Sequence, residues 1–187
     1  MRNSDPDAAV YWLARMLEAG EDPLYVARRL VRFASEDVGL ADSRALEICV
    51  AAYQACHIFG YAGVYGTSDA CGGVPFRRSP NPMRCTKLTR PPKKDALEML
   101  DEPVPLVIRN APTRLMKELH YGEGYQYAHD AQDKLTDMQC LPDSLQGRHY
   151  YVPTEQGSEA RVAERLAQIE AWRAAHRKPP GKRIRRM

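Results

Sequence analysis

The sequence lacks any long apolar run. No stretch of about 18 apolar residues occurs in its 187 residues, so no membrane-spanning helix is expected. The N-terminus passes from polar residues directly into an amphipathic pattern, without the basic and then apolar segments of a secretory leader. These two absences predict a cytoplasmic protein with no membrane partner.

Disulfide and metal-binding patterns are also missing. The sequence has five cysteines and five histidines, but no two cysteines form a C-x-x-C pair and the histidines have no zinc-like spacing. An odd, dispersed set of cysteines argues against both a disulfide framework and a metal site. Four histidines have no companion acid or nucleophile at a suitable spacing and are interpreted as structural or exposed: His57, His120, His129 and His149.

A third absence concerns nucleotide chemistry. The sequence has no G-x-x-x-x-G-K-S/T loop to hold phosphates, and no strand ending in acidic residues that would hold magnesium. We therefore predict no catalytic residue, no cofactor site and no metal ligand in this chain, and no ATP hydrolysis by this chain alone. An enzyme that uses a cysteine or a histidine is a remote interpretation.

Charge is unevenly distributed along the chain. The 27 Lys and Arg exceed the 24 Asp and Glu by three, yet residues 177–187 alone contribute six Lys or Arg and no acid. The remaining 21 basic residues (27 − 6) stand against all 24 acidic ones. The body is therefore mildly acidic, and we expect residues 177–187 to form a flexible basic tail.

Helical signals begin at the N-terminus. Ser4 or Asp5 is suited to cap a helix, Pro6 suits its first turn, and Gly20 suits the residue that follows its last turn. The pair Asp22–Pro23 repeats the same start signal at once. Two antiparallel amphipathic helices joined by a tight corner are predicted.

Further helices are predicted along the rest of the chain. The third begins near Asp42 or Ser43 and ends at Gly60, and helical character resumes over residues 93–102. A short helix is expected around Thr113 to Leu119, and the last helix is expected to start at Ser158. The fold class is therefore all-α.

Residues 61–92 interrupt this pattern. They contain four Gly and five Pro, and neither the helical nor the strand period survives there. An irregular segment of this length inside a compact domain is unusual. We expect residues 61–92 to be irregular.

Three long strings of residues resemble one protein family. They are SDPDAAVYWLARMLEAGEDPLYVARRLVRFASEDVGLAD at 4–42, VPLVIRNAPTRLMKELHYGEGYQYAHD at 104–130, and LPDSLQGRHYYVPTEQGSEARVAERL at 141–166. They resemble the C-terminal region of the AAA+ ATPases called replication-associated recombination protein A, or maintenance of genome stability protein A. The eukaryotic relative of that family is the Werner helicase interacting protein.

The resemblance implies a fold, an activity and partners. It implies a helical module similar to clamp-loader collar domains, which assembles the ATPase into a homotetramer and helps it act on DNA at stalled replication forks. ATP and magnesium would belong to the family's ATPase domain, which this sequence does not contain. Single-strand-binding protein or other replication proteins are further possible partners, and a bacterial, nucleoid-associated location is implied.

The resemblance also divides the chain into three parts. Residues 1–40 resemble the end of the AAA+ lid region, residues 41–176 form the helical oligomerisation domain, and residues 177–187 are the basic tail. A start at Met1, just before these helices, predicts a fragment, a separate domain or the remainder of a broken reading frame.

The segment 61–92 departs from the family, where two further helices containing a string similar to A-P-K-S-N-A are expected. Three single-base insertions near the codons of Tyr61, Pro80 and Lys93 would restore a helix-forming sequence of that kind. We hypothesise that residues 61–92 are translated out of frame. The alternative is a natural insertion, and sequencing of the DNA distinguishes the two.

Two groups of cations are candidates for contact with DNA phosphates. The first lies on the second predicted helix, where a merely solvated charged face is the stronger alternative. The second lies in the tail, where a phosphate-binding role and a solubilising role are equally supported. The two groups are Arg28, Arg29 and Arg32, and Lys178, Lys182, Arg183, Arg185 and Arg186.

Two further motifs are interpreted as structural. The family's R-N-A-P-T element stands here as Arg109, Asn110, Ala111, Pro112 and Thr113, and Asn110 is suited to cap a helix that Pro112 begins. Tyrosines also alternate with glycines over residues 121–127. They would be able to stack on bases, but packing against the helical body is favoured.

The leading interpretation is an oligomerisation module of a replication-associated recombination ATPase, without catalysis of its own. The alternative is a stand-alone helical DNA-binding protein that uses its basic tail.

Overall fold

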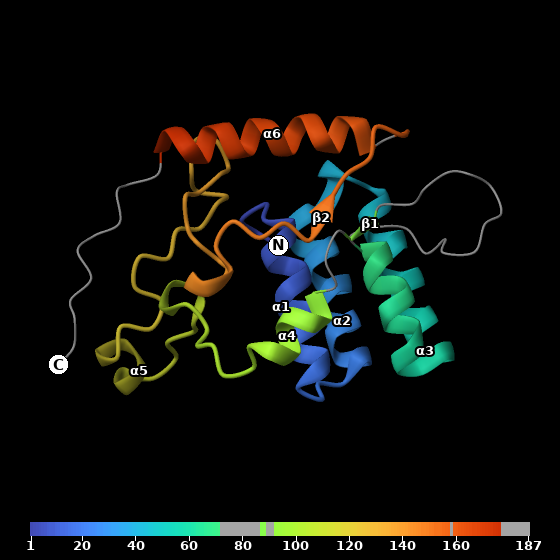
Figure 1. Cartoon of the computed structure of the whole chain (residues 1–187), viewed down its shortest axis with the longest axis horizontal. Coiled ribbons are helices and arrows are strands. Elements are labelled where there is room, and N and C mark those ends of the chain that lie inside the picture. The colour runs from blue at the N-terminus through green and yellow to red at the C-terminus, as the bar shows by residue number, and fades with distance from the viewer. Residues whose placement is uncertain (72–86, 89–91, 158, 177–187) are drawn as a thin grey trace.

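The computed structural model describes residues 1–71, 87–88, 92–157 and 159–176. Most regular structure in this part of the chain is helical, which confirms the all-α fold class (Figure 1). The α-helices are α1 (Pro6–Glu18), α2 (Pro23–Phe33), α3 (Arg44–Cys71), α4 (Pro92–Glu98), α5 (Arg114–Glu118) and α6 (Glu159–His176). Shorter helical turns are η1 (Ala34–Val38), η2 (Gly39–Ala41), η3 (Leu106–Ile108) and η4 (Asp143–Leu145).

The start signals of the first two helices work as the sequence predicts. The Asp5 carboxylate accepts a hydrogen bond from the Ala8 amide at 2.9 Å, and Gly20 follows α1 with a φ of 88°. The Asp22 carboxylate accepts from the Leu24 amide at 3.0 Å. These bonds satisfy backbone donors that the first turn of a helix leaves unpaired.

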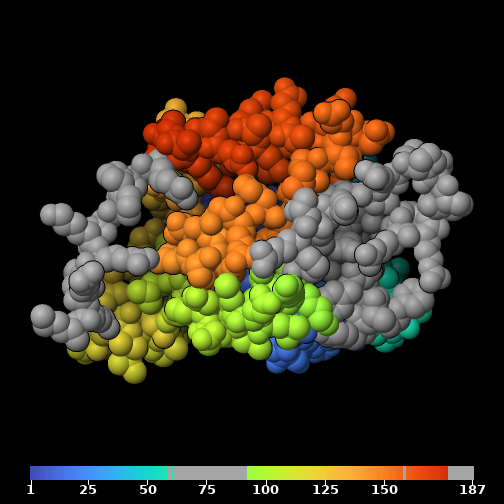
Figure 2. Space-filling view, in the orientation of Figure 1, coloured from blue at the N-terminus to red at the C-terminus, as the bar shows by residue number. Residues whose placement is uncertain are grey.

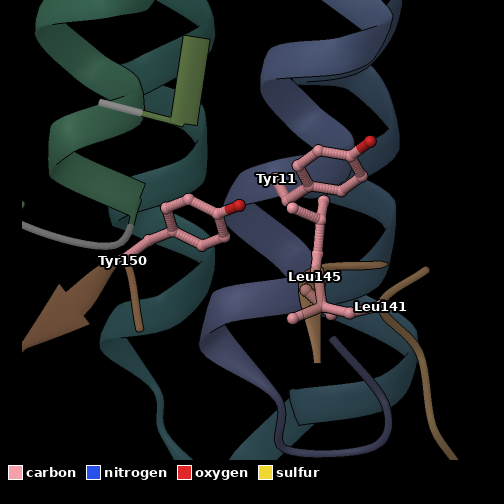
Figure 3. Close-up of a cluster of buried hydrophobic side chains, with 5 residues drawn as sticks. Tyr11, Leu141, Leu145 and Tyr150 are labelled. Atoms are coloured by element: carbon pink, nitrogen blue, oxygen red, sulfur yellow. The ribbon is translucent and has the colours of Figure 1, made fainter. Parts of the chain in front are cut away.

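One hydrophobic cluster joins the N-terminal helix to residues far along the chain. Tyr11 of α1 is fully buried against Leu141, Leu145 and Tyr150 (Figure 3). The rings of Tyr11 and Tyr150 stack with centroids 6.3 Å apart and planes 16° from parallel. Helix α1 also packs along α4, so segments from both ends of the chain share this core.

A second cluster forms the seam between α1, α2 and α3. Its buried members are Leu17, Val26, Ala27 and Cys56. Helix α2 packs along α3, whereas α1 meets α2 chiefly through Leu17 near its C-terminal end. The inner faces of α2 and α3 are therefore buried against each other, and their outer faces remain exposed.

The third helix continues farther than the sequence predicts. Gly60 breaks it, as expected, with a φ of 60° and a ψ of −147°. Helical backbone then resumes and reaches Cys71, so the expectation of an irregular segment from residue 61 onward is wrong for residues 61–71. Residues 72–86 and 89–91 lie outside the described part of the chain.

A short antiparallel strand pair lies beside the helices. Strand β1 (Lys87–Leu88) pairs with β2 (Tyr151–Val152), with Lys87 opposite Val152. The pair is two residues long on each side and leaves the all-α class unchanged. It connects the segment predicted to be irregular with the segment that precedes α6.

Helix α6 lies along one edge of the molecule, above the residues that lead into it (Figures 1 and 2). Its C-terminal half is anchored: Ile169 is buried, and the Trp172 indole Nε1 donates to the Asp133 carboxylate at 2.8 Å. Arg173 donates from Nη2 to the Asn3 carbonyl. Val162, nearer the start of α6, remains 39% exposed.

Candidate nucleic-acid interface

The outer face of α2 carries three arginines and a tyrosine. Val26 and Ala27 are buried on the inner face, whereas Tyr25 is 45% exposed and Arg28, Arg29 and Arg32 are all exposed. Spacings of three, four and seven residues from Tyr25 place the arginines on the same side of the helix as the ring. The face therefore combines an aromatic surface with three cations.

These cations are only loosely neutralised by carboxylates. Arg28 Nη2 lies 3.8 Å from an Asp22 oxygen, and Arg32 Nε lies 2.8 Å from a Glu36 oxygen. All four of those side chains are more than half exposed. Arg29 makes no ion pair with any described residue. Exposed pairs of this kind contribute about 0–1 kcal/mol, so a phosphate would be able to replace the carboxylates.

The R-N-A-P-T motif has a structural role that differs in part from the prediction. Helix α5 begins at Arg114, and its cap is Thr113, whose Oγ1 accepts from the Met116 amide at 3.3 Å. Asn110 is exposed and makes no cap, so the prediction that Asn110 caps a helix starting at Pro112 is wrong. Both residues are eligible caps, but the chain enters its helical turn only after Pro112.

Arg109, the first residue of that motif, braces the tyrosine loop. Its Nε donates to the Val104 carbonyl at 2.6 Å, and its guanidinium lies 4.9 Å from the centroid of the Tyr121 ring. Next to that ring, the Gly122 amide donates to the Leu106 carbonyl at 2.8 Å. A side chain at Gly122 would meet the Arg109 carbonyl oxygen at 3.2 Å, and its φ of +72° also favours glycine.

The tyrosine loop is only partly packed. Tyr121 is half-buried beneath Arg109, as the packing interpretation expects. Tyr125 and Tyr127 are 47% and 39% exposed, so more than half of each ring is covered, and the Arg2 guanidinium lies 5.9 Å from the centroid of the Tyr127 ring.

The structure does not bring the candidate site residues together. Helix α5, which follows the R-N-A-P-T motif, lies at one end of the molecule, away from α2 (Figure 1). The five candidate cations of the tail, Lys178, Lys182, Arg183, Arg185 and Arg186, lie outside the described residues. Of the two groups of candidate cations, the one on the outer face of α2 is therefore the group whose geometry is described.

A buried polar network joins α4 to the chain before α6, and sequence inspection missed it. The Asp95 side chain is fully buried and accepts from Arg148 Nη1 at 3.1 and 3.0 Å and from the Tyr150 hydroxyl at 2.9 Å. Burial and the hydrogen bond to Asp95 raise the pKa of the Tyr150 phenol well above its ordinary value. This network holds α4 against the segment 148–150.

A second aspartate fastens the same segment to α1. Asp7 Oδ1 accepts from the backbone amides of Tyr150 and Tyr151 at 2.6 and 2.9 Å, and its other oxygen lies 3.1 Å from His149 Nδ1. Asp7 and Asp95 sit on ordinary amphipathic helices, so no local signal marks either of them. Their roles depend on contacts with residues more than fifty positions away.

Metal-ligating side chains do not gather in the described part of the chain. No group of three His, Cys, Asp or Glu side chains able to hold a metal ion occurs among the described residues. Cys140 accepts a hydrogen bond from Asn3 Nδ2 at 3.3 Å, and burial raises the pKa of its thiol. A thiol with a raised pKa is mostly protonated near neutral pH and is a poor nucleophile. No helix in the described part of the chain is long and apolar enough to cross a membrane.

Comparison with known proteins extends the family resemblance over most of the chain. A family model described as MgsA AAA+ ATPase C terminal matches residues 3–170. The chain is 41% identical to replication-associated recombination protein A of Coxiella burnetii, over 95% of this chain and 40% of that protein. It is 42% identical to the protein of the same name from Haemophilus influenzae, over 90% of this chain and 38% of that protein.

A eukaryotic relative is similar as well. The protein named ATPase WRNIP1 from Dictyostelium discoideum is 39% identical, over 81% of this chain and 17% of that protein. The resemblance predicted from the three strings is thereby confirmed. The chain spans about two fifths of the length of its bacterial relatives.

Proposed function

Because this chain belongs to the family of MgsA AAA+ ATPase C-terminal domains, we propose that it is the oligomerisation module of a replication-associated recombination ATPase. In this proposal it joins four copies of the protein and adds contacts to DNA at stalled replication forks. ATP and magnesium act in an ATPase core that this sequence does not contain. The module itself supplies no catalysis.

The outer face of α3 is the observation that carries the assembly proposal. Ala52 and Cys56 are buried on its inner face against α2. On the outer side Leu46, Val50 and Ile58 are 41%, 38% and 71% exposed, at spacings of four and eight residues. These spacings place the three side chains along one side of the helix.

Exposed apolar side chains continue beyond these three. Ile48 is 49% exposed on the same helix, and Leu40, just before it, is 98% exposed. Single exposed apolar residues are common on protein surfaces, whereas a larger exposed apolar patch marks an interaction site. Burial of such a face against a second copy removes about 25 cal/mol of unfavourable hydration per Å².

Light scattering combined with gel filtration tests the assembly proposal. The wild-type chain is expected at four times its single-chain mass, and the variant carrying Val50→Glu and Ile58→Glu at the mass of one chain. Leu115→Glu, which changes a 63% exposed leucine on α5, is the matched control and should leave the mass unchanged. A wild-type chain that remains monomeric at high micromolar concentration contradicts the proposal.

The DNA-contact part of the proposal is supported by the outer face of α2. Cations that neutralise phosphates release counterions, and exposed rings stack on unpaired bases. Both elements occur there in Tyr25, Arg28, Arg29 and Arg32. A stand-alone DNA-binding protein that acts through its tail is the second candidate. It predicts a monomer that keeps its full salt-dependent DNA affinity, whereas the assembly module predicts a tetramer.

A further inference from the structure

The outer side of α3 is complementary to itself about the middle of the helix. Leu46 and Ile58, both exposed, lie six positions on either side of Ala52. Glu47 and His57, exposed as well, lie five positions on either side of the same residue. If a second copy of the helix is turned end for end over this midpoint, apolar residues meet each other and the acid meets the base. A contact between identical copies related by a two-fold axis requires this kind of self-complementarity.

The side chains concerned form one stripe, away from the contact of α3 with α2. On a helix of 3.6 residues per turn, six exposed residues fall within about one third of the circumference. They are Leu46, Glu47, Val50, Gln54, His57 and Ile58. The buried residues Ala52 and Cys56 fall on the opposite side of the helix. The stripe is therefore able to bind a partner without disturbing the core contacts of the same helix.

An antiparallel pair of α3 helices centred on Ala52 satisfies the whole stripe. Leu46 then packs against Ile58 of the second copy, and Glu47 lies beside its His57. Gln54 lies only two positions from the midpoint, so its amide is able to bond to Gln54 of the second copy. A polar group at the centre of the contact thereby keeps a hydrogen-bond partner when water is excluded.

A parallel pair of the same helices is less favourable. It places Glu47 of one copy beside Glu47 of the other, so two like charges are brought together. It also sets two helix dipoles side by side in the same direction. In the antiparallel pair both interactions become attractive, because Glu47 faces His57 and the dipoles are opposed.

We propose that α3 binds α3 of a second copy in antiparallel register about Ala52, with Leu46 against Ile58 and Glu47 against His57 across the pair. The inference rests on the proposed function, since it gives the assembly face one partner and one orientation. A two-fold contact joins two chains, so four chains assemble as two such pairs. The second contact, made only between pairs, completes the tetramer.

Carbodiimide cross-linking of the His57→Lys variant tests the register directly. The reagent forms an amide between a carboxylate and an amine that are in contact. Glu47 and position 57 are ten residues apart, about 15 Å along one helix, so an amide between them joins two chains. Proteolysis and mass spectrometry should detect this amide. In an equal mixture of isotope-labelled and unlabelled chains, after subunit exchange, about half of it should join differently labelled chains.

The control variant adds Val50→Glu and Ile58→Glu to His57→Lys and should give no such amide. If His57→Lys chains assemble but form no amide between Glu47 and position 57, the register is overturned and the assembly proposal stands. If these chains and the wild-type chains stay at the mass of one chain, both proposals are overturned. Light scattering on the same samples tells the two failures apart.

Exchange of charges tests the same pairing without a cross-linker. Glu47→Lys combined with His57→Lys places like charges at both symmetry-related contacts. The concentration at which half of the chains are associated should then be about tenfold higher than for His57→Lys alone. Glu47→Lys combined with His57→Glu exchanges the two charges and should restore the value of His57→Lys. Sedimentation equilibrium measures these concentrations. If the exchanged variant associates as weakly as the variant with like charges, the pairing of Glu47 with His57 is overturned.

Discussion

Helices α2 and α3 pack against each other but present opposite chemistry outward. The outer face of α2 carries three exposed arginines, whereas that of α3 carries Leu46, Val50 and Ile58. Both faces depend on the same inner seam of small and apolar residues. The comparison teaches that one helical pair is able to serve two kinds of partner, because the seam fixes the direction in which each outer face points.

Removing the seam should affect both faces at once, and this is the largest effect expected. Leu17→Ala deletes a 2% exposed side chain between α1, α2 and α3 and should lower the free energy of unfolding by about 3 kcal/mol. Urea unfolding followed by circular dichroism measures it. Met16→Ala, at a 40% exposed neighbour, should cost less than about 1 kcal/mol. Equal losses in the two variants would contradict the assignment of the seam.

Weakening a contact away from the seam should leave the functions of both outer faces, assembly and DNA binding, unchanged. Tyr150→Phe removes the hydroxyl that donates to buried Asp95, and should lower the free energy of unfolding by about 1–3 kcal/mol at neutral pH. Chain mass and DNA affinity should remain those of the wild type. A change in either property would mean that the α4 network, and not the seam alone, orients the two faces.

The same variant makes a prediction about alkaline pH. The folded protein raises the pKa of Tyr150, because burial and Asp95 both favour the neutral phenol. The protonated Tyr150 phenol contributes fully to stability below the pKa of about 10 that it has in the unfolded chain. This contribution is lost as the pH rises toward the higher pKa of the folded protein. The wild type should therefore lose more stability above about pH 10 than Tyr150→Phe does. Tyr25→Phe, at an exposed ring, should follow the wild-type curve.

Neutralising the α2 face should leave assembly intact. Replacing Arg28, Arg29 and Arg32 together by Gln should lower DNA affinity about tenfold. The plot of log affinity against log salt concentration should also become less steep, with a slope smaller in magnitude by about 3. The chain mass should stay the same. Arg161→Gln combined with Arg165→Gln, on exposed positions of α6, is the control. Fluorescence anisotropy over a salt series measures both quantities, and a loss of equal size in the control would assign the contact to general charge.

Single substitutions on the α2 face should give the smallest effects. Arg29 has no ion pair among the described residues, whereas Arg28 lies 3.8 Å from Asp22. Arg29→Gln should therefore weaken DNA binding about threefold, and Arg28→Gln by less than twofold. The same anisotropy titration ranks them. The reverse order would show that the weak pair to Asp22 positions Arg28 for DNA.

Local signals allowed the first helices to be predicted from the sequence. The caps Asp5 and Asp22, each followed by proline, act within three residues of the bonds they make. The cap of α5 was predicted wrongly because Asn110 and Thr113 are both suitable and the sequence does not say where the turn begins. The helix past Gly60 was missed because its residues have no clear period.

The candidate surfaces were predictable only in part. The α2 arginines could be found because charge opposite an apolar stripe is visible in the sequence. The exposed side chains of α3 could not, since Leu46 and Val50 have the same sequence pattern as core residues and only the structure gives their exposure. The contacts of Asp95 with Arg148 and Tyr150 join positions more than fifty residues apart, so local reasoning had no access to them.

The contact between Tyr11 of α1 and Tyr150 bears on how the protein folds during synthesis. Helix α1 is synthesised about 140 residues before its ring partner and the backbone amides that bind Asp7. At roughly 5–20 residues per second, that interval is on the order of ten seconds. During this time the apolar side of the first helix has no native cover, which makes the nascent chain a natural client for chaperones until its distant partner arrives.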